Sequence, residues 1–255
     1  MELFDFAFFP NFNESIVALA NLAADETWCF ANDTDQYSIL KNYLEHTFRR
    51  VRHEKKIKQN QAGSRLVFNT GLFTANFEEI YALFQEHRNP PATNPTQKFF
   101  SGFRKSSAID IVNHFDQLPE RANYFGKPEN LIFDPNKGIA INIDHIVDDN
   151  INRLPVAFRN NRNVMMMLLD GAITKSKKLA TLDYKIAIPQ CHDNHIQLLL
   201  PLFMTSEETP DAALVLANIN NSYRASTILT LRMAYNNARL IVKPSSYWLS
   251  PQAVN

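Results

Sequence analysis

The 255-residue sequence predicts an α+β fold with a helical N-terminal part, an antiparallel sheet in the C-terminal half, and a C-terminal helix packed on that sheet. Apolar residues recur at helical spacing early in the chain, whereas β-branched and leucine-rich runs separated by turn residues follow residue 183. We expect a single domain over residues 1–255. The alternative is a subdomain boundary near residues 89–98, where RNPPATNPTQ holds three prolines in ten residues.

The N-terminal part is expected to begin with two helices. The first lies near residues 13–24, because Asn13 and an acid after it precede an apolar run. The second lies within YSILKNYLEHTFRRVRHEKKIK, whose apolar residues are three and four positions apart. Two extended segments around a turn should follow, SRLVFNTGLFT and EEIYALFQEH, although the second also fits a short helix.

The middle of the chain gives a mixed pattern. SSAIDIVNHF is expected to be helical with a serine cap, and LPERANYF to be turn-like. LIFDPNKGIAINI reads as two short strands around a DPNKG turn, because Asp, Pro, Asn and Gly supply the backbone angles of turns. A helix is expected in RNNRNVMMMLLDGAITKSKKLA, with its three methionines as core filler.

The C-terminal part is expected to form the antiparallel sheet from the runs YKIAIPQ, HIQLLLPLFM and AALVLANI. Between the first two, CHDNH contains a thiol and two imidazoles, which are metal-ligand types. Its position between two strands favours a hairpin turn at Asp193 and Asn194 over a metal site. The last segment, STILTLRMAYNNARLIV, should begin extended and close as a helix.

Composition excludes several functional classes. Lys and Arg equal Asp and Glu at 26 each, so the protein has no global field that would attract nucleic acid or an anionic membrane. The phosphate-loop patterns GxGxxG and GxxxxGK[ST] are absent. Without a long apolar stretch or a signal-peptide pattern we expect a soluble protein and no membrane association. Two cysteines fit a cytoplasmic, intracellular setting.

The stretch NIDHIVDDNINR is the first candidate site. Asp144 could cap a helix, with Asp148 and Asp149 in its first turns, and this purely structural interpretation stays open. Alternatively, Asp144, Asp148 and Asp149 could hold a divalent metal, the only cofactor that the sequence suggests. His145 would then be a general acid or base, and Arg153 or Arg239 would neutralise developing phosphate charge. The expected catalytic group is Asp144, His145 and Arg153.

A basic segment is the second candidate. Six cations fall within ten residues at the end of the second expected helix: Arg49, Arg50, Arg52, Lys55, Lys56 and Lys58. Cations at a helix C-terminus oppose the helix dipole, and charged runs are usually solvated faces. The functional alternative is a patch that contacts phosphates. In MAYNNARLI, amide and guanidinium groups could likewise recognise phosphates or base edges.

Several segments together resemble a known family, the OHA domain, which is associated with OST-type helix-turn-helix (LOTUS) modules. The resemblance is carried by ILKNYLEHTFRR, FNTGLF, LPERANYF, LIFDP, DHIVDDNINRLP, QLLLPLF and TLRMAYNNARLI. It implies a link to RNA through the companion modules and transfers no reaction. It implies that a shared site would lie among Arg121, Asp144, His145, Asn150, Arg153, Asn237 and Arg239.

The function expected from the sequence is therefore an RNA- or nucleotide-binding domain that holds phosphates with its basic segment. One alternative is a metal-dependent enzyme that processes phosphodiesters or nucleotides with the Asp144 and His145 segment. Another is a protein-interaction module in which the basic helix docks on an acidic partner.

Overall fold

The computed structural model describes residues 2–86 and 98–253, and the chain forms two compact units. Unit 1 comprises Met1–Cys29 and Asp33–Asn123, and unit 2 comprises Phe30–Asn32 and Tyr124–Asn255. All of the alternative boundary near residues 89–98 except its last residue falls outside the described residues. The expectation of one domain stays a prediction, because two compact units can still unfold as one cooperative domain.

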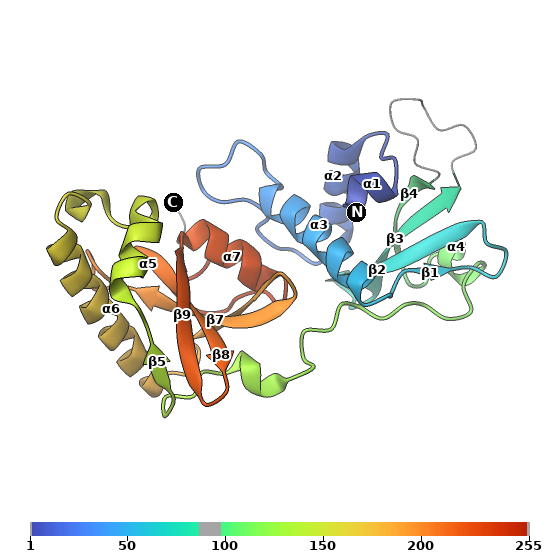
Figure 1. Ribbon diagram of the computed structural model, residues 1–255. Coiled ribbons are helices and arrows are strands. Elements are labelled where there is room, and N and C mark those ends of the chain that lie inside the picture. The colour runs from blue at the N-terminus through green and yellow to red at the C-terminus, as the bar shows by residue number, and fades with distance from the viewer. Residues whose placement is uncertain (1, 87–97, 254–255) are drawn as a thin grey trace. The chain divides into compact units, whose positions relative to one another are not determined.

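Unit 1 combines a four-stranded antiparallel sheet, in the order β1-β2-β3-β4, with helices α1 to α4 in its described residues (Figure 1). The segment EEIYALFQEH, which fitted either structure, forms strand β3 and pairs with both neighbours. The elements are α1 (Leu3–Phe6), α2 (Phe12–Leu22), α3 (Ser38–His53), β1 (Lys58–Gln59), β2 (Arg65–Phe73), β3 (Glu79–Glu86), β4 (Lys98–Lys105) and α4 (Ile109–Val112).

Both faces of this sheet are covered, because alternate side chains of each strand point to opposite faces. On one face the ring of Phe48 in α3 lies 5.6 Å from that of Phe68 in β2, which stacks on Phe84 of β3 at 5.8 Å. On the other face, residues of β2 and β3 pack against α4 and the segment after it, in a cluster of Val67, Tyr81, Leu83, Ile111 and Phe115. The phenylalanine-rich composition thus supplies the core of unit 1.

Unit 2 is built on a five-stranded sheet in the order β5-β9-β8-β7-β6, in which only the β5–β9 pair is parallel. The predicted C-terminal sheet and helix are confirmed (Figure 1). The elements are the 3-10 helix η1 (Pro128–Leu131), β5 (Gly138–Ala140), α5 (Ile143–Asn150), the 3-10 helices η2 (Ile151–Arg153) and η3 (Val156–Phe158), α6 (Arg162–Leu182), β6 (Ile188–His192), β7 (His195–Leu202), β8 (Ala212–Ile219), β9 (Ser222–Leu229) and α7 (Leu231–Arg239).

The sheet of unit 2 lies between two helical layers. Alternate residues of β7 and β8, among them Leu200 and Leu214, pack on α5 and α6 in one extensive apolar cluster. The helix α7 contacts β6, β8 and β9 and lies on the other side of the sheet from α6 (Figure 1). The run of fully buried residues in β7 follows from this arrangement, because a strand covered on both faces needs no polar side.

Two expectations for unit 2 need correction. LIF does not form a strand: Leu131 ends the helix η1, and the ring of Phe133 stacks on that of Tyr223 at 5.0 Å. Of the methionines expected in the core, Met165 is buried, but Met167 is 75% exposed. None of the helices in the described residues is both long and apolar enough to span a membrane.

Candidate nucleic-acid interface

The basic segment of unit 1 starts where α3 ends, and the helix end has a defined geometry. The N–H of Lys56 donates to the carbonyl of Val51 at 2.7 Å, and that of Lys55 to Arg52 at 3.0 Å. This pair of bonds is the Schellman arrangement, which usually places glycine at the left-handed position. Here Lys55 occupies it with φ 57°, a conformation that is unfavourable for a residue with a side chain. The backbone therefore fixes the point on the surface from which the exposed Lys55 side chain extends into the solvent.

Glu54 holds part of the basic segment in ion pairs. Its carboxylate accepts hydrogen bonds from Arg50 and Lys56 and from the backbone N–H of Asn123. Burial raises the pKa of Glu54, but the bonds from Lys56, the Asn123 backbone and Arg50 together lower it below its ordinary value. Arg50 also donates to the Asn123 carbonyl at 2.7 Å. Arg50 and Lys56 thus join α3 to the segment before Asn123.

The remaining predicted cations of this segment lie nearer the solvent. Arg49 is 44% exposed and pairs with Glu2. Arg52, Lys55 and Arg121 are exposed, and no salt bridge to an acidic side chain is shown for Lys55 or Arg121 in the described residues. The structure therefore divides the predicted phosphate-binding set: Arg50 and Lys56 have structural partners, whereas Lys55 and Arg121 are accessible to a ligand.

Two segments far apart in the sequence run side by side here. Lys56 donates to the Arg121 carbonyl at 2.9 Å, Lys58 to Gln117 at 3.2 Å, and Gln61 to Asp116 at 2.7 Å. These bonds connect residues 56–61 with residues 116–121. Residues 49–58 and 114–121 hold seven Lys and Arg against three Asp and Glu, so this surface is locally positive although the whole chain is neutral.

A polar pocket of about 290 Å³ lies between the same two segments. It was not predicted, because its two walls are separated by more than fifty residues and neither contains a recognisable motif. Most of its side chains carry amide, imidazole, ammonium or carboxylate groups, which together offer both hydrogen-bond donors and acceptors. The lining residues are Lys58, Gln59, Asn60, Gln61, His114, Phe115, Asp116 and Gln117.

The acidic segment of unit 2 is organised by an arginine that the sequence analysis did not consider. Arg162, at the start of α6, binds Asp148 through two hydrogen bonds of 3.0 and 3.1 Å and Asp144 through an ion pair of 2.9 Å. Hydrogen bonding to Arg162 lowers the pKa of Asp148 below its ordinary value. The two carboxylates thus already have a cationic partner, which serves the packing of α5 on α6.

The interpretation of Asp144 as the helix cap is wrong, because Asn142 caps α5 and accepts a hydrogen bond from the His145 N–H. His145 lies 3.3 Å from Asp149, and both side chains are mostly exposed. Across residues 2–86 and 98–253, no three side chains of His, Cys, Asp or Glu form a group that could hold a metal ion. The metal and catalytic roles stay predictions without a converging ligand set.

Asn150 and Arg153 hold α5 against the sheet. The Asn150 carbonyl oxygen accepts from the Thr227 hydroxyl at 2.8 Å and from Arg153 at 3.0 Å, and its amide donates to the Ile146 carbonyl. Arg153 also donates to the Ile228 carbonyl at 2.7 Å. These contacts satisfy a buried polar group beside strand β9 and give both residues a structural role.

Asn237 and Arg239 lie on α7 and show the same pattern. The Asn237 amide donates to Gln190 of β6 at 3.0 Å, and Gln190 donates in turn to Gln197 of β7. Arg239 is only 7% exposed. The structure therefore does not place these two residues where a solvent-borne polyanion could reach them easily. The expected turn at Asp193 and Asn194 is confirmed, since both have positive φ in the β6–β7 hairpin.

Comparison with protein families matches residues 19–248 to DUF3825, which is described as a domain of unknown function. The match covers most of both units. Neither the curated proteins nor the solved structures gave a match. The OHA resemblance is not tested by this match and stays a prediction.

Proposed function

Since the chain belongs to the DUF3825 family, whose description names no activity, we propose from the residues themselves that it binds single-stranded RNA or a nucleotide. The binding surface is the basic segment of unit 1 together with its polar pocket. The observation that carries the proposal is that hydrogen bonds connect residues 56–61 with residues 116–121 and that a pocket of hydrogen-bonding side chains lies between these segments, close to exposed cations.

Phosphate binding is assigned to the cations that can turn toward a ligand. Lys55 and Arg121 are exposed, and Arg52 lies on the last turn of α3, close to Lys55 in the sequence. Arg50 and Lys56 contribute positive charge but keep their bonds to Glu54 and the 121–123 backbone. Phosphates held in this way release counterions, so binding should weaken steeply with salt.

Base recognition is assigned to the polar pocket. At about 290 Å³ it approaches the smaller ligand pockets of proteins, which begin near roughly 300 Å³. Gln61 and Gln117 offer both donors and acceptors at its wall, and Phe115 adds an aromatic ring. Single-stranded nucleic acids expose the base edges that such groups recognise, whereas a duplex hides them. The RNA link implied by the OHA resemblance points in the same direction.

The test is fluorescence anisotropy of a labelled single-stranded RNA titrated with the whole chain at two salt concentrations. The double variant Lys55→Glu, Arg121→Glu should weaken binding at least about tenfold and lower the salt slope by roughly 0.7 per lost phosphate contact. The control is Lys127→Glu, Lys178→Glu, which reverses two exposed charges of unit 2 and should leave affinity nearly unchanged.

A second variant separates base recognition from charge. Gln117→Ala leaves the net charge unchanged, so it should reduce the preference among RNA homopolymers while the salt slope stays constant. If the double variant in unit 1 and the control double variant in unit 2 lose RNA affinity equally, the assigned binding surface is wrong. Loss of the labelled RNA after addition of Mn²⁺ would contradict a pure binding function and favour the enzyme alternative. Absence of any binding at low salt would overturn the proposal.

A further inference from the structure

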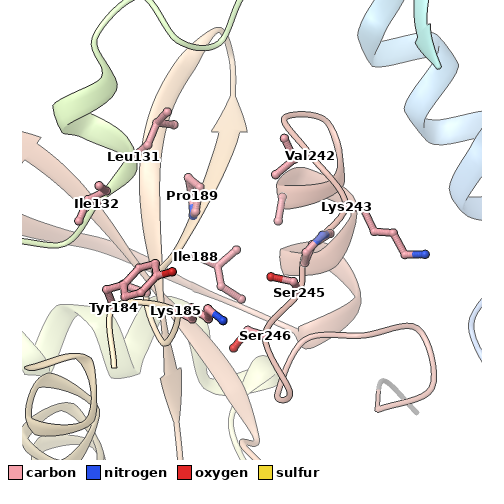
Figure 2. A pocket seen from close by; sticks show the side chains of 13 residues that line it. Leu131, Ile132, Tyr184, Lys185, Ile188, Pro189, Val242, Lys243, Ser245 and Ser246 are labelled. Carbon is pink, nitrogen blue, oxygen red and sulfur yellow. The ribbon is translucent and has the colours of Figure 1, made fainter. Parts of the chain in front are cut away.

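A second pocket, of about 180 Å³, lies in unit 2 between β6 and the chain that follows α7 (Figure 2). Its walls are mainly apolar, with Leu131 and Ile132 on one side, Pro189 at the back and Val242 opposite. Ile132 and Val242, on the two sides of the pocket, are 58% and 48% exposed. The pocket therefore presents apolar surface to the solvent.

The charged side chains that line this pocket are all positive. Two lysines and no carboxylate occur among its lining residues. In the part of the chain that the structure describes, neither Lys185 nor Lys243 is in an ion pair. Figure 2 shows the ammonium group of Lys185 on the side facing Ser245 and Ser246, whereas Lys243 extends away from the pocket. Lys185 can thus meet an anion inside the pocket.

Ser246 gives an independent indication of a ligand. Its side chain lines the pocket and is 8% exposed, and its hydroxyl has no hydrogen-bond partner. Buried hydroxyl groups are nearly always hydrogen-bonded, because leaving one unsatisfied is unfavourable. The chain around it is held in place, since Leu249 donates to the Ser246 carbonyl and Trp248 donates to the Ile186 carbonyl at 2.9 Å. An acceptor atom from a bound molecule would satisfy this hydroxyl.

We infer that this pocket binds a small organic anion whose apolar part is about the size of one ring. The size follows from the volume, because an engineered apolar cavity of about 150 Å³ holds benzene. The apolar part packs between Ile132, Pro189 and Val242. The anionic group, a carboxylate or a phosphate, accepts hydrogen bonds from Lys185 and from the Ser246 hydroxyl, and such charge-assisted bonds are strong.

The experiment is ligand-observed NMR on the whole chain with four probes: phenylacetate, phenyl phosphate, uncharged 2-phenylethanol and inorganic phosphate. Phenylacetate or phenyl phosphate should bind, more tightly than 2-phenylethanol, and inorganic phosphate should bind weakest. Whichever of the first two binds better identifies the anionic group. Lys185→Gln should weaken binding of the charged aryl probe about tenfold, which is the effect of losing one charge-assisted hydrogen bond. The affinity for 2-phenylethanol should not change.

The matched control is Lys243→Gln, which removes the same charge from a side chain directed away from the pocket and should change affinity less than about twofold. Val242→Phe should block binding of all three aryl probes by filling the space, and the Trp248 indole resonance reports that the fold is kept. RNA binding should be unchanged in all three variants, so the two proposals fail or succeed separately. Equal effects of the two lysine changes, or no binding of either aryl anion, would overturn the inference.

Discussion

At the scale of single residues, several polar side chains that resemble a functional set are bonded within their own unit. Asn150 and Arg153 join α5 to β9, and Arg50 joins the end of α3 to Asn123. The residue types were a correct guide to strong hydrogen bonding, but not to whether the partner is the protein or a ligand. The accessible candidates are instead Lys55 and Arg121.

The role of Asn150 can be measured directly. Asn150→Ala should lower the free energy of unfolding by about 2 kcal/mol, because it removes a buried acceptor of three hydrogen bonds and leaves their donors unsatisfied. Urea unfolding would measure this. Asn152→Ala, an exposed neighbour, is the control and should change stability by less than about 0.5 kcal/mol. Intact stability together with lost RNA binding would instead make Asn150 a ligand-binding residue.

Glu78 predicts a pH dependence for unit 1. Hydrogen bonds from the Ser107 side chain and the Lys105 ammonium lower the pKa of this carboxylate from 4.5 to about 2. Because the folded-state pKa is the lower one, the stabilisation is complete above about pH 4.5 and is lost as the pH falls from 4.5 toward 2. The melting temperatures of the wild type and Glu78→Gln should therefore differ most near pH 6 and converge in acid.

The control for this titration is Glu208→Gln, an exposed carboxylate whose side chain makes no hydrogen bond among the described contacts. It should lower the melting temperature little at any pH. If the difference in melting temperature between the wild type and Glu78→Gln stays constant from pH 6 to pH 2.5, the lost stability comes from packing rather than from the charge of Glu78.

At the scale of helices and strands, the sequence was most informative where the structure depends on local residues. Helix α3 follows from the spacing of its apolar residues, and the β6–β7 hairpin from Asp193 and Asn194, which tolerate positive φ. Prediction failed where the local structure depends on contacts with residues far away in the sequence. The segment LIF forms no strand, and its Phe133 ring instead stacks on that of Tyr223, a residue far away in the sequence. The polar pocket and the Arg162 ion pairs also depend on tertiary packing, which no local pattern encodes.

Helix α7 depends on a residue that the linear sequence places far from it. The ring of Phe30 lies 5.7 Å from that of Tyr235 and 4.6 Å from the guanidinium of Arg232. Phe30→Ala should lower the free energy of unfolding by about 3 kcal/mol or more, since it removes a buried aromatic ring from this contact. Hydrogen exchange should then show faster exchange in Leu231–Arg239, with β2 and β3 unaffected. Phe77→Ala, at a side chain 85% exposed, should leave both regions as they are.

At the scale of the whole molecule, the net charge is zero although positive charge is in excess at particular sites. Lys and Arg balance Asp and Glu over the chain, yet the surface around the end of α3 carries an excess of cations, and the pocket of unit 2 is lined by lysines without carboxylates. The neutral chain has no long-range attraction to polyanions. Selectivity must therefore arise at short range, where individual side chains contact the ligand.

The three residues Phe30–Asn32 belong to unit 2, although the chain on both sides of them belongs to unit 1. Neither unit is consequently one uninterrupted piece of sequence, and no single cut yields both halves intact. A gene fragment that starts at Tyr124 would encode unit 2 without the aromatic anchor of α7. An expression boundary between the two units would therefore separate Phe30–Asn32 from the rest of unit 2, so both units should be expressed in one chain. Supplying a peptide that carries Phe30 to such a fragment would be a complementation experiment that this topology makes possible.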